Sequence, residues 1–363
     1  MEFEDIPRIE PVSNQKASIY NIGFDELRSV CENWGEPAYR AKQIWEGLYK
    51  QYFSDPDMFS TLPKGLRIKL GNTYRFTSLY PEATLLSDDR NTEKTLFRLT
   101  DNRAIEAVLM SYDIRRTVCI SSQSGCAMGC VFCATGQMGY YRNLTSGEIV
   151  EQILYYQREL SSSGEKISNI VIMGMGEPLH NYDATMAAID RMNDKDGSNI
   201  GARRFTISTV GLVPGIQRFT NEQRQINLAI SLHAIDDDLR TSMLPINKKY
   251  PLSELLSACW AYTETTRRRI TFEWALIKGV NDTVEQAHKL GKQLKGHLCH
   301  VNIIPLNPTQ QYKGSPSTKS TARDFQRILM GYGISCTIRI RRGIDIQAGC
   351  GQLAIQHTST TKV

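Results

Sequence analysis

The stretch from Cys119 to Gly139, CISSQSGCAMGCVFCATGQMG, decides the fold class of this chain. Within it Cys126, Cys130 and Cys133 form a C-x3-C-x2-C pattern, so three of the nine cysteines in 363 residues stand within eight positions. Thiolates are the soft ligands of iron–sulfur centres, and a compact loop with three of them provides ligands for three corners of a cubane cluster. The fourth iron then lacks a protein ligand and is open to the amino and carboxylate groups of a small molecule.

Two other uses of these cysteines fit the sequence less well. Structural zinc takes four ligands, usually as two spaced pairs, and no second pair lies near this loop. A disulfide framework is disfavoured because the chain shows no secretory signal and its other cysteines are scattered. The spacing, with an aromatic Phe132 just before the third cysteine, resembles that of the radical S-adenosylmethionine (SAM) superfamily.

The composition predicts a cytoplasmic globular protein. The chain is 41% hydrophobic and 22% charged, and its length allows one large α/β domain and an appendage. It contains no apolar run near the ~18 residues of a membrane span, and its start, MEFEDIPRIE, is acidic rather than signal-like. A net charge of +5 permits a polyanionic partner without requiring one.

The N-terminal quarter predicts a small helical module. Residues 1–20 lack periodicity and are expected to form an arm without a fixed fold, whereas residues 21–78 show helical patterns near 24–33, 38–51 and 64–70. The polar face of this module carries Arg40, Lys42, Lys50, Lys64, Arg67 and Lys69. Together with Tyr39 and Tyr49, these residues suggest an RNA-binding accessory domain, with an ordinary solvated face as the alternative.

The rest of the chain predicts an α/β barrel. Residues 79–115 alternate with a period of two and suggest a short antiparallel β extension. Over residues 116–352 strands and amphipathic helices alternate, which favours a partial TIM-type barrel with an open doubly wound sheet as the alternative. A polar tail is expected over 353–363.

Small polar residues recur at the ends of the predicted strands, where a barrel places its chemistry. Gly176 lets a ligand approach the backbone, and Glu177 is suited to bind the ammonium group of an amino acid on iron. We expect a rim for ribose and carboxylate groups from Ser208, from Ser231, Leu232 and His233, and from Asn307. From the residues alone, His233 receives no catalytic role, because nothing supplies further metal ligands beside it.

Two further cysteines stand out from the core-type cysteines. Cys350 lies in the glycine-flanked loop GIDIQAGCGQL, after the basic run Arg339, Arg341 and Arg342, in a setting that predicts a mobile, exposed and reactive thiol. Cys119 ends a predicted strand seven residues before the cluster loop. The remaining four cysteines are expected to be small core residues.

Ordered motifs along nearly the whole chain resemble the radical SAM RNA adenine-C2 methyltransferase family, RlmN. They are YRAKQIW (39–45), the cysteine loop, GMGEPLHN (174–181), ISTVGLVP (207–214), SLHA (231–234), MLPIN (243–247), VNIIPLNP (301–308) and CGQL (350–353). The resemblance implies one [4Fe-4S] cluster on Cys126, Cys130 and Cys133. It also implies SAM binding by Gly176, Glu177, Ser208, Ser231, Leu232, His233 and Asn307.

The resemblance also implies a mechanism. Adenine C2 is not nucleophilic, so one SAM would methylate Cys350 and a second would be cleaved to a radical that activates that methyl group. The methylene carbon would add to the base, Glu106 would accept the C2 proton, and Cys119 would release the product by forming a disulfide with Cys350. The implied substrates are 23S rRNA and tRNA, with an external flavodoxin-like reductant, and the protein is expected to be a monomer.

The chain departs from the family in the loop that carries Cys350. Gln347 and Gly349 replace the acidic residue and the alanine of the usual D-A-A-C run, and GIDI also occurs in the related C8 methyltransferases of the Cfr group. Pro178 favours C2 chemistry, since the C8 group tends to have alanine there. A C8 methyltransferase and a non-catalytic iron–sulfur RNA-binding protein are the alternatives.

Overall fold

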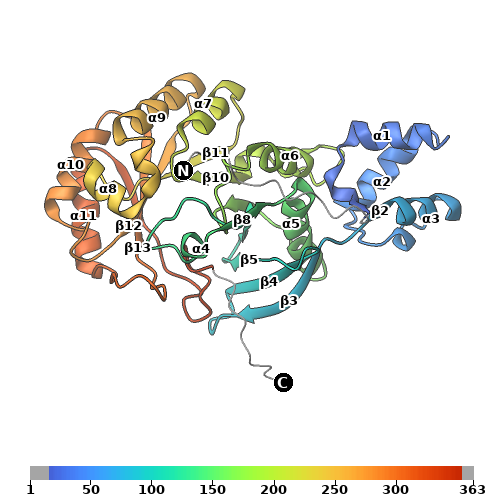
Figure 1. Cartoon of the computed structure of the whole chain (residues 1–363), viewed down its shortest axis with the longest axis horizontal. Coiled ribbons are helices and arrows are strands. Elements are labelled where there is room, and N and C mark those ends of the chain that lie inside the picture. The colour runs from blue at the N-terminus through green and yellow to red at the C-terminus, as the bar shows by residue number, and fades with distance from the viewer. Residues whose placement is uncertain (1–15, 354–363) are drawn as a thin grey trace.

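The structure is a computed structural model that describes residues 16–353. Its N-terminal module contains α1 (Phe24–Asn33), α2 (Tyr39–Tyr49) and α3 (Lys64–Thr73), which confirms the three predicted helices. These helices lie at one end of the molecule, beside α5 and α6, and α10 and α11 lie at the other end (Figure 1).

The predicted unfolded arm is wrong for residues 17–20, while residues 1–15 lie outside the described part of the chain. Strand β1 (Ala17–Ser18) pairs in parallel with β2 (Tyr74–Arg75), and Ile19 and Tyr20 are fully buried. The Tyr20 hydroxyl accepts a hydrogen bond from Arg158 at 3.0 Å. Burial of these two apolar side chains, rather than any periodicity, holds the segment against the barrel.

A mixed ten-stranded sheet forms the body, in the order β14-β13-β12-β11-β10-β9-β6-β5-β4-β3. The antiparallel part is β3 (Leu79–Leu86), β4 (Thr92–Leu99) and β5 (Ala104–Ser111), and it is the predicted β extension. The parallel part is β6 (Arg116–Cys119), β9 (Asn169–Ile172), β10 (Phe205–Thr209), β11 (Asn227–Ser231), β12 (Ile270–Leu276), β13 (Cys299–Pro305) and β14 (Ser335–Ile338). Since β14 and β3 are the two edges of this order, the parallel strands form a partial barrel that does not close.

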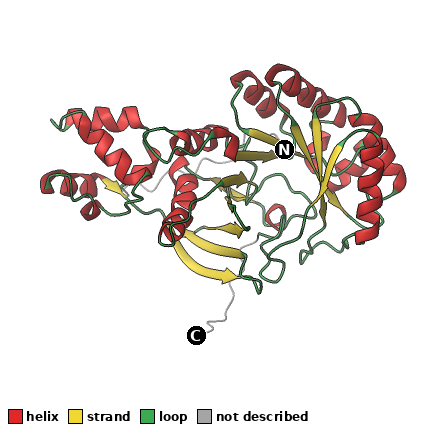
Figure 2. Cartoon of the chain, turned by 180° about the vertical axis from the view of Figure 1, so that it is seen from behind, coloured by secondary structure: helices red, strands yellow, loops and turns green. Residues whose placement is uncertain are grey.

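Helices cover the outer side of the curved sheet (Figure 2). They are α5 (Ser146–Ser161), α6 (Tyr182–Asn193), α7 (Val213–Glu222), α8 (Asp237–Met243), α9 (Leu252–Thr266), α10 (Val284–Leu294) and α11 (Lys319–Gly331). Helix α5 begins where the sequence dictates, because Thr145 and Glu148 form a capping box. No described helix is long and apolar enough to cross a membrane.

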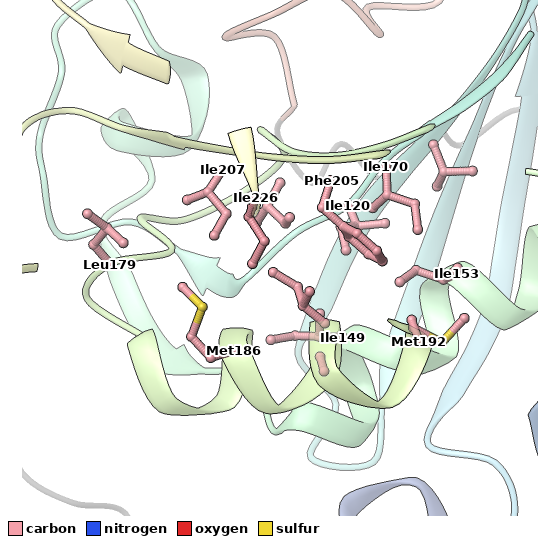
Figure 3. Close-up of a cluster of buried hydrophobic side chains, with 14 of the residues drawn as sticks. Ile120, Ile149, Ile153, Ile170, Leu179, Met186, Met192, Phe205, Ile207 and Ile226 are labelled. Carbon is pink, nitrogen blue, oxygen red and sulfur yellow. The ribbon is translucent and has the colours of Figure 1, made fainter. Parts of the chain in front are cut away.

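The core lies between these helices and the parallel strands. Figure 3 shows Ile149 and Ile153 of α5 and Met186 of α6 turned toward Ile170 of β9 and Ile207 of β10. All five side chains are at most 3% exposed. Burying side chains of this size contributes about 1.5–3 kcal/mol each, so this layer holds the strand ends at fixed positions.

Two elements near the cysteine loop have no counterpart in the sequence prediction. The hairpin β7 (Gln123–Gly125) and β8 (Tyr140–Asn143) closes the base of the loop, and the short helix α4 (Ala134–Gln137) follows its third cysteine. Gly125 has φ +73°, and a Cβ there would lie 2.0 Å from the carbonyl oxygen of Gly139. Only glycine therefore permits this crossing of the two chain segments.

Candidate active site

A cavity of about 210 Å³ lies at the carboxyl ends of the parallel strands, where the barrel geometry predicts chemistry. Six of the seven parallel strands contribute to its wall, residues 339–342 just after β14 add to it, and the cysteine loop and the C-terminal loop close it. The predicted site residues in its lining are Cys119, Cys126, Cys130, Cys133, Gly176, Glu177, Ser208, Ser231, His233, Asn307 and Cys350. Sequence positions more than two hundred residues apart therefore meet in one place.

The three cysteines of the C-x3-C-x2-C loop face this cavity together. The loop is compact because Cys133 N–H donates to the Cys130 carbonyl at 3.1 Å, and a Cβ at Gly136 would lie 2.9 Å from the Cys130 nitrogen. Burial raises the pKa of all three thiols, that of Cys126 to about 12. A metal is the natural means to hold buried cysteines as thiolates.

The arrangement suits a cluster better than a single ion. Zinc needs ligands that converge on a single point, whereas a cubane cluster binds each thiolate through a different iron. The donor set therefore fits the cluster that the spacing predicts.

Glu177 lies in the same cavity as a carboxylate without a charged partner. It is 3% exposed and forms no salt bridge with any described residue. Its oxygens accept N–H groups of Leu179 at 3.0 Å and Val210 at 2.9 Å. Burial raises the pKa of Glu177 to about 7, so an ammonium group placed here would be a favourable partner.

Local packing requires glycine at position 176, and Asn307 has an unpaired acceptor in the cavity wall. A Cβ at Gly176, whose φ is +103°, would lie 2.5 Å from the Gln123 side chain, so the chain beside Glu177 admits no larger residue. The Asn307 side-chain oxygen is buried without a hydrogen-bond partner among the described residues. An unpaired buried acceptor is costly, and a donor group of a bound molecule would remove that cost.

His233 is a neutral group in the cavity wall. Burial, with Arg240 nearby, lowers its pKa to about 3. Its Nδ1 accepts the Ala275 N–H at 2.9 Å, which leaves the proton on Nε2, and its ring lies edge-on to Phe132 with centroids 5.1 Å apart. A neutral imidazole N–H serves as a hydrogen-bond donor rather than as a charge.

Leu232 differs from the other predicted site residues in where its side chain lies. Its side chain is fully buried and does not line the cavity, whereas Ser208 and Ser231 are half-buried in the lining. Its backbone joins strand β12 through an N–H to the Glu273 carbonyl at 3.1 Å. Leu232 could therefore contact a ligand only through its backbone and not through its side chain.

Cys119 and Cys350 are free thiols in one cavity. Burial is the main cause that raises the pKa of Cys119 to about 12, and the neighbouring Cys350 adds to it. Cys350 also raises the pKa of Cys133. The thiol of Cys350 thus lies within electrostatic reach of a cluster cysteine and of the strand-end cysteine.

Hydrogen bonds hold the loop around Cys350 in place, so the prediction of a mobile, exposed loop is wrong. Asn307 Nδ2 donates to the Cys350 carbonyl at 3.0 Å, and the Gly349 N–H donates to the Gln352 side chain at 3.1 Å. The Gly351 carbonyl accepts the Ala134 N–H at 2.8 Å. These bonds, together with a half-buried Cys350, fix the thiol against the cysteine loop.

One departure from the family pattern has a structural explanation. A Cβ at Gly349 would lie 2.7 Å from both the Asn307 amide nitrogen and the Gln352 side-chain oxygen, so glycine fits this packing. Gln347 adopts φ +52°, a conformation that an amide residue tolerates less easily than glycine.

Glu106 lies outside the thiol cavity. It lines a neighbouring cavity of about 130 Å³ together with Lys94. Lys94 Nζ is 3.1 Å from Glu106 Oε1, and the two side chains are 8% and 4% exposed. Glu106 and Val108 lie on the same face of β5, since residues two apart in a strand do so, and Val108 lines the thiol cavity.

Sequence reasoning did not assign to the site the charged residues of the cavity wall, of which Arg339 and Glu273 have shifted pKa values. Arg339 follows β14, and the nearby Cys350 and Glu273 raise the pKa of its guanidinium. Burial raises the pKa of Glu273, whose Oε2 accepts the Asn302 amide at 2.9 Å. The basic run after the last strand was a signal for Arg339, whereas Glu273 lies in an apolar strand and gave none.

The open barrel with a three-cysteine loop above its strand ends defines the class of radical SAM enzymes, which use a [4Fe-4S] cluster and SAM. The Radical SAM superfamily model matches residues 120–291, and the model of the Ribosomal RNA large subunit methyltransferase N-terminal domain matches residues 18–75. The chain belongs to the RlmN family of radical SAM methyltransferases.

Two relatives show this membership over nearly the full length. Dual-specificity RNA methyltransferase RlmN 1 of Myxococcus xanthus is 49% identical over 341 residues, which are 94% of this chain and 95% of the relative. The crystal structure of a radical SAM methyltransferase from Sphaerobacter thermophilus is 47% identical, with a TM-score of 0.91 over 93% of this chain and 99% of that one. The non-catalytic interpretation is therefore wrong.

Proposed function

We propose that this protein is a dual-specificity RNA methyltransferase that methylates C2 of adenosine in 23S rRNA and in tRNA. The observation that carries the proposal is the meeting of Cys119 and Cys350 in the cavity that the cysteine loop closes. A methyl acceptor and a thiol that resolves its adduct must be able to meet for a disulfide to form, and a shared cavity permits this. The names of the relatives, dual-specificity RNA methyltransferases, support the two RNA classes.

Cys126, Cys130 and Cys133 would hold one [4Fe-4S] cluster, and Gly176, Glu177, Ser208, Ser231, Leu232, His233 and Asn307 would form the SAM site. When bound, the cluster and SAM supply a methyl group and an organic radical, with two SAM molecules used per turnover. Glu177 is suited to the ammonium group of SAM because it is buried and carries no salt bridge among the described residues. The unpaired oxygen of Asn307 is suited to a hydroxyl or amino donor.

In this proposal Cys350, Glu106 and Cys119 each carry out a different step of the reaction. The Cys350 thiolate accepts the methyl group, which later loses one hydrogen atom and forms a carbon–carbon bond with C2 of the base. Glu106 takes the C2 proton. One electron passes from the adduct radical to the external one-electron carrier, and the Cys119 thiolate then attacks the Cys350 sulfur. The S–C bond breaks with its electron pair on the methylene carbon, which takes up a proton, and the methylated base leaves as the disulfide forms.

The helical module supplies the RNA-binding surface in this proposal. Its basic residues Lys42, Lys50, Lys64 and Lys69 are exposed, as is Tyr39. Tyr49 is fully buried beside Trp45, so its predicted place on that surface is wrong. Exposed lysines on one module suit contacts with phosphates, which add affinity without reading sequence.

We also propose the division of the chain at 21–78, 79–115 and 116–352 as functional units for RNA binding, β extension and catalysis. The protein acts in this proposal as a monomer in the cytoplasm, where ribosomal and transfer RNA occur and thiols stay reduced. An external flavodoxin-like protein would deliver the single electrons.

Analysis of the RNA product tests the proposal. Anaerobically reconstituted enzyme is incubated with SAM, reductant and 23S rRNA fragments or tRNA, and digested RNA is examined by mass spectrometry. We expect methyl on C2 of adenosine in both RNAs, and methyl on C8 or on neither position would refute it. Cys350→Ala should give neither product nor adduct, Cys119→Ala should leave RNA covalently attached to the protein, and the core variant Cys299→Ala should behave as the parent.

A further inference from the structure

We propose that Lys94 is a positioning residue for the reaction: its ammonium group joins the carboxylate of Glu106 to the loop that carries Cys350. Through Lys94, the carbonyl of Gln347 in that loop helps to fix the position of the proton acceptor. This inference rests on the proposed function, in which Glu106 takes the C2 proton.

The contacts of Lys94 reach both partners at once. Its Nζ lies 3.1 Å from Glu106 Oε1 and donates to the backbone carbonyl of Gln347 at 3.4 Å. Lys94 and Gln347 are 253 positions apart in the sequence, and Gln347 is three residues before Cys350. One side chain therefore connects the β extension, the proposed proton acceptor and the methyl-carrier loop.

Sheet register places these groups on one face. Lys94 of β4 is opposite Val108 of β5, and Val108 is opposite Cys119 of β6. Residues directly opposite in antiparallel strands share a face, so Lys94 belongs to the same row as the thiol that resolves the adduct. Glu106, two residues before Val108, lies on this face too.

The pair lies in a cavity whose walls are mainly apolar. The cavity that Lys94 and Glu106 line is completed by Ala83, Leu85, Leu96 and by residues 345–347 of the carrier loop. Its other ionisable group, Asp345, uses Oδ2 to accept the Asp88 N–H at 2.8 Å on the β3–β4 turn. Lys94 is thus a cation in direct contact with the Glu106 carboxylate in a buried setting.

Removal of one member of such a pair leaves the remaining buried charge less well compensated, which raises the pKa of a carboxylate and favours its protonation. A protonated Glu106 cannot accept the C2 proton. Loss of Lys94 should therefore stop the reaction after the base has bonded to the Cys350 methyl carbon and before Cys119 releases it. The methylation of Cys350 itself precedes that step and should be spared.

The test uses full-length, cluster-loaded Lys94→Met with SAM, reductant and RNA. We expect iron content and methyl-Cys350, measured by peptide mass, to stay within about twofold of the parent, while methylated adenosine falls about tenfold or more and the RNA adduct accumulates on denaturing gels. Lys94→Arg should restore most of the product, because guanidinium keeps the charge. The control Arg98→Met, which removes an exposed ion pair with Glu82 from the same strand, should match the parent.

A double variant guards against a purely structural effect. Glu106→Gln carries no charge to compensate, so adding Lys94→Met to it should cause no further loss of product. Normal product from Lys94→Met would overturn the inference, and so would losses that multiply in the double variant. Should Lys94→Met lose iron, the test moves to Lys94→Arg. If Lys94→Arg keeps its iron but makes as little product as Glu106→Gln, the inference is overturned. A parent enzyme that makes no C2-methyladenosine refutes the proposed function instead.

Discussion

The release of product should accelerate steeply with pH, because desolvation raises the pKa of the attacking thiol. Burial raises the pKa of Cys119 to about 12. A thiol with such a pKa is a thiolate in about one molecule in 10⁵ at pH 7 and about one in 10³ at pH 9. Since the thiolate is the nucleophile in disulfide formation, the rate of adduct release should rise about tenfold per pH unit, or about 100-fold from pH 7 to pH 9.

Two neighbours modify this expectation without changing its direction. Cys350 contributes to the raised pKa of Cys119, but it is bonded to carbon in the adduct, so that contribution is lost at the release step. Arg339 opposes the rise, so Arg339→Met should slow release at a given pH and keep the same slope. Burial is the larger cause and persists throughout.

The measurement is a single turnover quenched at intervals in denaturant, with the RNA–protein adduct followed on gels between pH 7 and pH 9. Cys119→Ala serves as the control, since its adduct should not decay at any of these pH values. Methylation of Cys350, measured by peptide mass in the same buffers, reports whether pH alters an earlier step. A release rate that does not change with pH would show that Cys119 does not attack as a thiol of raised pKa.

Four other changes test separate parts of the site. Cys126→Ala should abolish iron binding and SAM cleavage, and a variant with full iron content would contradict the cluster assignment. Glu177→Gln should weaken SAM binding about tenfold or more, because a buried charge partner of the ammonium group is lost, and unchanged calorimetric affinity would exclude this role. Asn307→Ala should slow Cys350 methylation about fivefold, because it removes one hydrogen bond worth about 1 kcal/mol. An unchanged rate would show that other contacts alone hold the loop. Lys64→Gln combined with Lys69→Gln should reduce the salt slope of RNA binding by about 2, and an identical slope would remove the module from the interface.

The sequence was sufficient for the course of the chain through the barrel. Strand β12 and helix α10 lie where alternation of buried and amphipathic patterns places them, because burial of a periodic face is a local property of sequence. The same holds for the cysteine loop, since three ligands within eight positions must share one site. The segment 17–20 escaped prediction because Ile19 and Tyr20 are buried by helices far away in the chain.

Contacts between distant segments could not be predicted in the same way. The pairing of Lys94 with Glu106 depends on the register of β4 against β5, and a shift by one residue would turn Lys94 to the opposite face. The position of Arg339 beside Cys350 depends on how the last loop folds back over the strand ends. Tyr49 was misplaced because an amphipathic pattern does not distinguish a tyrosine at the edge of a face from one packed beneath it.

The link between the cysteine loop and the C-terminal loop constrains how this enzyme can change over evolution. The Ala134 N–H donates to the Gly351 carbonyl at 2.8 Å, and the Thr135 hydroxyl donates to the Leu353 carbonyl at 2.7 Å. The segment that holds the cluster is therefore fastened to the segment that carries the methyl acceptor. A chimera that exchanges one of these segments with a relative should need the other from the same parent, so the two are expected to be inherited and redesigned as a matched pair.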